Sequence, residues 1–276
     1  GMFKARGLDV VVQSIESVGE RKQALAAGKI QAMAASLDVA VSAAEELPLK
    51  FVWAFDTSAG ADGLLVKPEI KKLADLKGKQ VAYHKGSASH LLLTELLAKA
   101  GMKDSDIVSV DMKASEAAAA FMAGKVDAAI TWEPHLTKAA KQGGVILHTS
   151  KDTPGLIADG LVFKEDFVKA NPAAVQKIVE ALAEATDYLL KNQAEASKIL
   201  AAAFKMKPED VAADFPTMKF YDLKGNLEFY GTAEKPGPIY EVVKKDADFY
   251  VSQKVLKKVP DLKNIIDNSF ILKIKK

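Results

Sequence analysis

An internal repeat constrains the fold of this chain more than any other feature of its sequence. The segment Ala24–Ile30 returns 96 residues further on as Ala120–Val126, and both copies end in Gly-Lys before an aliphatic residue. The segment Ala61–Lys67 returns 97 residues further on as Ala158–Lys164, with five of the seven residues identical. Two matches at nearly the same offset predict a chain built from two similar units.

Each copy of the repeat predicts the same order of elements: helix, strand, helix, strand. The first helix is expected to end at a glycine in the left-handed conformation, Gly28 in one copy and Gly124 in the other. Short apolar strands that alternate with helices are typical of an α/β fold with a buried parallel sheet. The expected strands are 30–35, 49–55, 80–84, 107–112, 126–131 and 145–148, and the expected helices are 20–27, 36–46, 89–100, 115–123, 133–142, 195–204, 208–214 and 238–251, with one more that begins at Pro172.

The repeat also predicts how the α/β fold is divided. Lobe 1 is expected to contain residues 1–67 and 158–276, including a helical C-terminal third, and lobe 2 residues 68–157. The segments 61–67 and 158–164 are expected to be two hinge strands that join the lobes. Open α/β sheets bind ligands beyond the carboxyl ends of their strands, so a cleft between the lobes is the expected binding site.

Composition excludes several classes of function. Lys and Arg number 38 and Asp and Glu 36, so the net charge of +2 predicts no binding to nucleic acid or to an anionic membrane. The absence of cysteine excludes disulfides, thiolate metal sites and thiol nucleophiles. No apolar run is long enough to span a membrane. The four histidines lack the spacing of metal ligands, and we expect neither a metal nor a cofactor.

The best candidate site in the sequence is the junction between strand 80–84 and helix 89–100. Gly86 lets the backbone turn sharply, and Ser87 or Ser89 can cap the helix. The free N–H groups at a helix N-terminus can hold a small anion such as a sulfonate, a carboxylate or nitrate. An ordinary N-cap that binds nothing is the alternative.

Other candidates lie at the ends of the remaining strands. The repeat offset pairs Ser36 with Trp132, which predicts that both lie at the mouth of their own lobe. Trp132 is expected to be a stacking wall or a lid, with a core tryptophan as the alternative. Glu133 also suits the first turn of a helix, and Asp159 recurs where Asp62 stands in the first copy, so that a cap or turn role competes with ligand contact.

Several short motifs occur in an order that carries a family resemblance. They are Gly7–Val10, Ala26–Ile30, Leu76–Ala82, Lys85–Leu93, Ala123–Pro134 and Thr153–Ile157. Together the motifs resemble the nitrate/sulfonate/taurine family of periplasmic solute-binding proteins that serve ABC importers. The resemblance extends over roughly residues 2 to 215 and implies the two-lobed periplasmic-binding-protein-like (type II) fold.

The resemblance also implies roles for particular residues. The family's anion-holding turn falls on Gly86, Ser87, Ser89 and His90; its Trp-Asp-Pro wall falls on Trp132, Glu133 and Pro134; its small-residue turn falls on Ser36 and Asp38. Glu133 departs from the more common Asp. A second departure is that the family's usual first strand and helix have no counterpart before Gly1. We therefore expect an exposed sheet edge beside Val10–Val12 and a signal segment outside this sequence.

The expected function is that of a substrate-binding component of an ABC importer. It would bind a small anionic organic or inorganic solute and dock on the importer's permease, in the periplasm or anchored outside the cytoplasm. A monomer is expected unless the exposed edge of lobe 1 drives association. The alternative is an enzyme on the same fold, similar to thiamine-pyrimidine synthases, whose cysteine-rich motif is absent here, or to dehydratases that would use Asp38, Asp159 or His84 as a base. A sensory ligand-binding domain is a third alternative.

Overall fold

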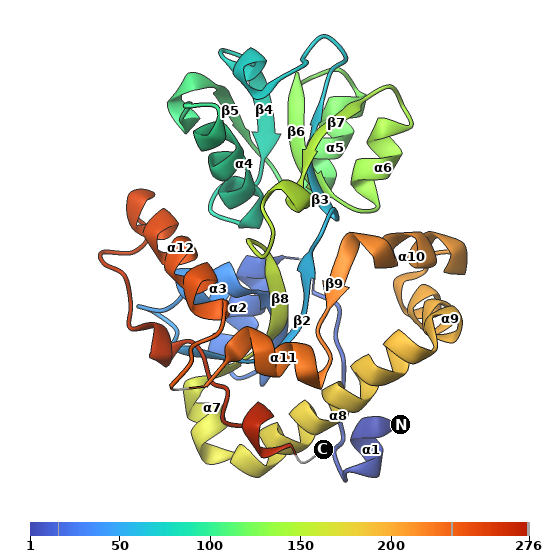
Figure 1. The fold of residues 1–276 in the computed structure, drawn as a ribbon, viewed down its shortest axis with the longest axis vertical. Helices are drawn as coiled ribbons and strands as arrows, with labels where there is room; N and C mark the ends of the chain where they lie inside the picture. Colours follow the sequence, from blue (N-terminus) through green and yellow to red (C-terminus); the bar gives the residue numbers. More distant parts are fainter. Residues whose placement is uncertain (16, 233, 275–276) are drawn as a thin grey trace. The chain divides into compact units, whose positions relative to one another are not determined.

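The computed structural model describes residues 1–15, 17–232 and 234–274. The chain forms two compact units (Figure 1), and each is described by itself. Unit 1 contains residues 1–56, 158–199 and 220–276, and unit 2 contains residues 57–157 and 200–219. These bounds differ from the expected lobes at two places, because residues 57–67 and 200–219 belong to unit 2.

Unit 1 is built on a four-stranded sheet with the order β1-β8-β2-β9. Its strands are β1 (Ala32–Ser36), β2 (Leu49–Ser58), β8 (Ala158–Lys164) and β9 (Met218–Phe220), of which β2 and β9 run across the boundary of the unit. Its helices are α1 (Met2–Ala5), α2 (Val18–Ala26), α3 (Leu37–Ser42), α7 (Glu165–Ala170), α8 (Pro172–Lys191), α9 (Gln193–Phe204, which continues into unit 2), α11 (Leu223–Tyr230) and α12 (Ile239–Ser252).

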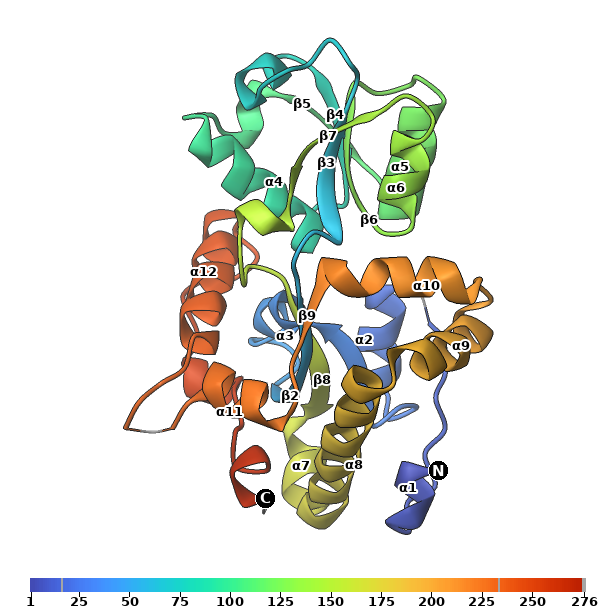
Figure 2. The ribbon, with the colours of Figure 1, turned by 45° about the vertical axis from the view of Figure 1, so that its right-hand side comes forward.

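Unit 2 is built on a five-stranded sheet with the order β5-β4-β6-β3-β7. Its strands are β3 (Asp62–Val66), β4 (Gln80–Tyr83), β5 (Val108–Asp111), β6 (Ala128–Trp132) and β7 (Val145–Thr149), and its helices are α4 (Ala88–Lys99), α5 (Ala114–Met122), α6 (His135–Ala140) and α10 (Pro208–Asp214). Helix α4 covers one face of the sheet, whereas α5 and α6 cover the other (Figure 2). Short 3-10 helices lie at 73–76, 104–106, 150–152, 215–217, 262–264 and 271–273.

The two copies of the repeat end their first helices in the same way. Gly28 after α2 and Gly124 after α5 each have a φ of +71°. In both copies the glycine N–H donates back to the helix, to Leu25 O in one and Phe121 O in the other. The left-handed C′ glycines predicted from the repeat are therefore confirmed.

The strands of the repeat pair across the copies, and this arrangement corrects the expectation of parallel sheets. Strand β1 pairs antiparallel with β8, and β6 pairs antiparallel with β3. The last strand of each copy therefore lies next to the first strand of the other copy, in the same sheet. Only part of the predicted parallel arrangement is present, since β4 runs parallel to both β5 and β6. The unit 2 sheet is therefore mixed.

The segment Val10–Val12 does not form a strand. The side chains of Val11 and Val12 are 76% and 86% exposed. The outer strands of the unit 1 sheet are β1 and β9 instead. The expected sheet edge at Val10–Val12 is therefore wrong: the run of valines has the β-branched residues of a strand, but no neighbouring strand pairs with it in the described structure.

Candidate functional site

The candidate site in unit 2 begins where β4 ends and α4 begins. Gly86 has a φ of +67°, which turns the chain between the two elements. Ser87 is the N-cap of α4: its Oγ accepts a hydrogen bond from Ser89 N at 3.2 Å and donates one to His84 O at 2.7 Å. The predicted capping role of Ser87 is confirmed, and the N-terminus of a twelve-residue helix stands at this turn.

His90 holds this turn in place. The N–H of Gly86 donates to His90 Nδ1 at 3.2 Å, so the ring proton lies on Nε2, which is 2.9 Å from Asp104 Oδ2. Asp104 also accepts a hydrogen bond from Thr94 Oγ1 at 3.2 Å. The His90 ring is buried, with its centroid 4.9 Å from that of Tyr83. Both ring nitrogens are used within the protein, so His90 positions the backbone of the turn.

Ser89 has a different environment from Ser87. Its side chain is fully buried, and Ser89 Oγ has no hydrogen-bond partner among the described residues. A buried hydroxyl without a partner costs free energy, on the order of 1–3 kcal/mol. Ser89 Oγ is therefore an unpaired hydroxyl buried in the first turn of α4.

Trp132 and Asp62 lie at the same edge of the unit 2 sheet as this turn. Strands β4 and β6 are parallel neighbours, so their carboxyl ends, at Tyr83 and Trp132, meet at one edge. Trp132 is 40% exposed, which excludes the alternative of a core tryptophan. Asp62, buried at the start of β3, stands opposite Trp132 in the register.

Glu133 interacts with the first turn of α6. Its carboxylate accepts hydrogen bonds from Thr137 N at 3.0 Å and from Thr137 Oγ1 at 2.7 Å. The carboxylate thus satisfies a free N–H in the first turn of α6 and faces the positive end of that helix. This agrees with the prediction that Glu133 suits a first helical turn.

In unit 1, Ser36 and Asp159 form the corresponding edge. Ser36 ends β1 and is the N-cap residue of α3, without a side-chain capping bond. Asp159 stands opposite Ser36 where β1 and β8 pair, as Asp62 stands opposite Trp132 in unit 2. The equivalence of Ser36 and Trp132 that the repeat predicted is therefore confirmed.

Arg21 is a residue of this edge that the sequence analysis missed. It lies on α2, its Nη1 donates to Ala34 O of β1, and the charge of Asp159 acts on it. Burial lowers the pKa of the guanidinium, an effect that Asp159 opposes. One feature of the sequence could have drawn attention to Arg21: arginine is rare here, since Arg6 and Arg21 are the only arginines in a chain rich in lysine.

Asp38 is packed inside unit 1. It is 3% exposed, and its Oδ2 accepts a hydrogen bond from Tyr250 Oη of α12 at 2.7 Å. Burial and the neighbouring Asp38 raise the pKa of Tyr250, because both disfavour a phenolate. Asp38 therefore joins α3 to α12, and its suggested contact with a solute stays a prediction.

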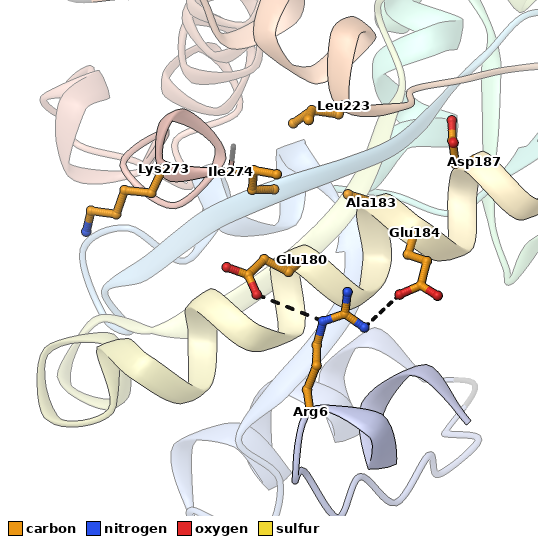
Figure 3. Close-up of a pocket in the computed structure, with 8 residues that line it drawn as sticks. All are labelled: Arg6, Glu180, Ala183, Glu184, Asp187, Leu223, Lys273 and Ile274. Atoms are coloured by element: carbon orange, nitrogen blue, oxygen red, sulfur yellow. Dashed lines mark hydrogen bonds and ion pairs between the residues drawn. The ribbon is translucent and has the colours of Figure 1, made fainter. Parts of the chain in front are cut away.

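Each unit contains a cavity among its described residues. The first, of about 620 Å³, lies in unit 1 between α1, α8 and the C-terminal segment (Figure 3). Arg6 reaches from α1 to α8, with Nη1 2.7 Å from Glu184 Oε2 and Nε 3.9 Å from Glu180 Oε2. None of the predicted site residues lines it. The second, of about 840 Å³, lies in unit 2 and includes Glu133.

The described residues add two negative findings. No helix within 1–15, 17–232 and 234–274 is both long and apolar enough to cross a membrane. In the same part of the chain, no group of three or more His, Cys, Asp or Glu side chains could hold a metal ion.

Known proteins resemble this chain in sequence. The sequence model of the family described as NMT1/THI5 like matches residues 1–196. The taurine-binding periplasmic protein of Escherichia coli (strain K12) is 27% identical over 276 residues, which cover 95% of this chain and 82% of that protein. A second protein of the same strain, named for the binding of aliphatic sulfonates, is 38% identical over 148 residues, 53% of this chain. The chain matches 46% of that relative, about half of its length.

A solved structure also resembles the chain. The periplasmic aliphatic sulphonate binding protein SsuA from Escherichia coli superposes with a TM-score of 0.75 and 24% identity, covering 92% of this chain and 80% of that chain. This likeness confirms the predicted α/β, periplasmic-binding-protein-like fold. The family match covers well over half of the sequence. The chain therefore belongs to the NMT1/THI5-like family.

Proposed function

We propose that this protein is an extracytoplasmic binding protein for a small organic sulfonate or a similar anion, and that it delivers this solute to the permease of an ABC importer. The observation that carries the proposal is the N-terminus of α4, where Ser87 caps the helix and the buried Ser89 Oγ has no described partner. The names of the relatives support a sulfonate or taurine as the solute.

The chemistry of the turn suits an anion of this kind. The first N–H groups of a helix and its dipole favour negative charge, and a hydroxyl can add a charge-assisted hydrogen bond. The exposed Trp132 at the same sheet edge offers an apolar surface for the organic part of the solute. His90 and Asp104 hold the turn in its conformation, so the donors are placed before the solute arrives.

The edge of unit 1 offers a second set of groups for an anion. Arg21 carries a permanent charge there, beside Asp159 and close to the end of β1. Closure of the two units on one solute, with 61–67 and 158–164 as hinge strands, stays a prediction of the sequence. The proposed role is binding without covalent chemistry.

The test is isothermal titration of the full chain with ethanesulfonate, taurine and nitrate. The double variant Ser87→Ala/Ser89→Ala is expected to weaken binding of the preferred anion by one to two orders of magnitude, about 1.5–3 kcal/mol. The matched control is Ser115→Ala, an exposed serine in the first turn of α5. An unchanged dissociation constant in the double variant, with its fold verified by circular dichroism, excludes the α4 turn as the site.

A further inference from the structure

The second cavity lies wholly within unit 2 and has a volume of about 840 Å³. Its walls come from α6 on one side and, on the other, from the segment that leads from the end of α9 through α10 to Thr217. This volume falls within the usual range of small-molecule pockets. The α4 turn contributes no residue to the lining.

Four lysines line this cavity. Lys138 lies on α6 and Lys141 directly follows it, whereas Lys205 and Lys207 flank Met206 in the connection between α9 and α10. None of them takes part in an ion pair found among the described residues. Four like charges around one cavity repel each other, and an anionic group bound among them relieves that repulsion.

Carboxylates form a separate part of the wall. Asp214 is partly buried, and burial together with the neighbouring Glu133 and Asp210 raises its pKa. Asp214 ends α10 and Glu133 precedes α6. Lys207 precedes α10 and Lys141 follows α6, so these lysines and carboxylates stand at opposite ends of the two helices. An ammonium group of a ligand beside Asp214 would supply the missing positive charge.

Apolar residues also line the cavity. Pro134, Met206 and Ala213 contribute to the lining, together with the methylene chains of the lysines. The wall therefore presents positive charge, apolar surface and negative charge in one cavity.

We infer that this cavity is a second small-molecule site, which binds ω-amino acids: molecules with an anionic group and an ammonium group at opposite ends of an apolar chain. The anionic end lies among Lys138, Lys141, Lys205 and Lys207, and the ammonium end lies beside Asp214. The site is distinct from the sulfonate site proposed at α4. It also gives a second role to Glu133, whose carboxylate caps α6 and lines the cavity.

The experiment uses three probes of the full chain: 6-aminohexanoate, hexanoate and 1-aminohexane. Binding is measured by titration calorimetry and mapped by backbone amide NMR shifts. We expect 6-aminohexanoate to bind more tightly than either single-charge probe and to shift the amides of α6 and α10. No binding of 6-aminohexanoate, or shifts confined to other segments, would overturn the inference.

Variants separate the contributions of the two ends. The double variant Lys205→Gln/Lys207→Gln is expected to weaken the binding of 6-aminohexanoate about tenfold, which corresponds to about 1.4 kcal/mol. The matched control is Lys71→Gln/Lys72→Gln, two adjacent exposed lysines of the same unit outside the cavity. If both double variants weakened the binding of 6-aminohexanoate equally, the effect would be one of net charge in general. That result would overturn the site.

Asp214→Asn tests the ammonium end, and it is expected to abolish the preference for 6-aminohexanoate over hexanoate. A retained preference would contradict the assignment of Asp214. Ser87→Ala/Ser89→Ala should leave 6-aminohexanoate binding unchanged, so failure of the α4 site and failure of this cavity site are distinguishable.

Discussion

Tyr250 of α12 donates a hydrogen bond to Asp38 in the first turn of α3, across 2.7 Å of protein interior. The two residues are 212 positions apart in the chain and both are buried. Asp246, one turn before Tyr250 on α12, is fully buried as well, and neither of its carboxyl oxygens has a partner among the described residues. The bond between Tyr250 and Asp38 joins α12, the last long helix of unit 1, to α3.

Tyr250→Phe is expected to destabilise the protein. The variant keeps the ring but leaves the buried Asp38 carboxylate without its phenolic donor, and hydrogen bonds to charged groups contribute about 1.5–3 kcal/mol. Urea unfolding at pH 7 measures the loss. Tyr188→Phe, at a position of α8 that is 38% exposed, is the control and should change stability little. Equal stability of Tyr250→Phe and the parent would contradict the role of this bond.

The Asp246→Asn variant is expected to be more stable than the parent, by a difference that grows as the pH rises. Burial, with Asp38 nearby, raises the pKa of Asp246 well above its usual value, an effect that Lys245 only partly opposes. Above about pH 4, where the unfolded chain releases this proton, the folded state still holds it, so the parent loses stability with rising pH. Asn does not titrate and avoids this loss.

The measurement is urea unfolding of Asp246→Asn and the parent at pH 4, 5.5 and 7. The gain of the variant over the parent should be larger at pH 7 than at pH 4. The control is Asp248→Asn on the same helix, an exposed residue paired with Lys244, which should show no such trend. A pH-independent difference for Asp246→Asn would mean that Asp246 has the same pKa in both states.

Local patterns in the sequence predicted the local structure, because helix ends and short apolar strands depend on neighbouring residues. Gly28 and Gly124 end their helices as expected, and Ser87 caps α4. Sequence similarity between the copies also predicted the equivalent places of Ser36 and Trp132, which the strand registers confirm.

Contacts between distant segments could not be predicted in this way. The pattern of β3 and β8 shows apolar strands but not which neighbours they join, so their antiparallel pairing and their places in the sheets were missed. The burial of Asp38 depends on Tyr250, and no local motif connects the two. The lysine-lined cavity depends on the packing of α10 near α6, far apart in the sequence.

Arg21→Gln is expected to lower the affinity for ethanesulfonate about tenfold, because it removes the permanent charge at the unit 1 edge. Titration calorimetry measures the change. Arg6→Gln is the natural control, since Arg6 is the only other arginine and pairs with Glu184 and Glu180 near the surface. Arg6→Gln should lower the free energy of unfolding by at most about 1 kcal/mol and leave the affinity for ethanesulfonate unaltered. Similar affinities in both variants would remove Arg21 from the site.

Gly160→Ala is expected to be far more destabilising than the equivalent change in the other copy of the repeat, Gly63→Ala. A Cβ at Gly160 would lie 2.2 Å from the carbonyl oxygen of Trp53 and 2.3 Å from the ring of Phe51, so the backbone of β2 would have to move. At Gly63 the nearest atom, at 2.8 Å, is the end of the Leu136 side chain, which can rotate away more easily. The nearest backbone atom there, the carbonyl oxygen of His148, lies at 3.0 Å, further away than the 2.2 Å at Gly160.

Overpacking of this kind costs typically about 1–3 kcal/mol, and Gly160→Ala is expected at or above the upper end of that range. Thermal and urea unfolding measure both variants. The control is Gly19→Ala in α2, where Ser17 Oγ at 3.7 Å is the one contact found among the described residues and where alanine favours the helix. If Gly63→Ala proved as destabilising as Gly160→Ala, the closer approach to a backbone carbonyl would not be what distinguishes the two glycines.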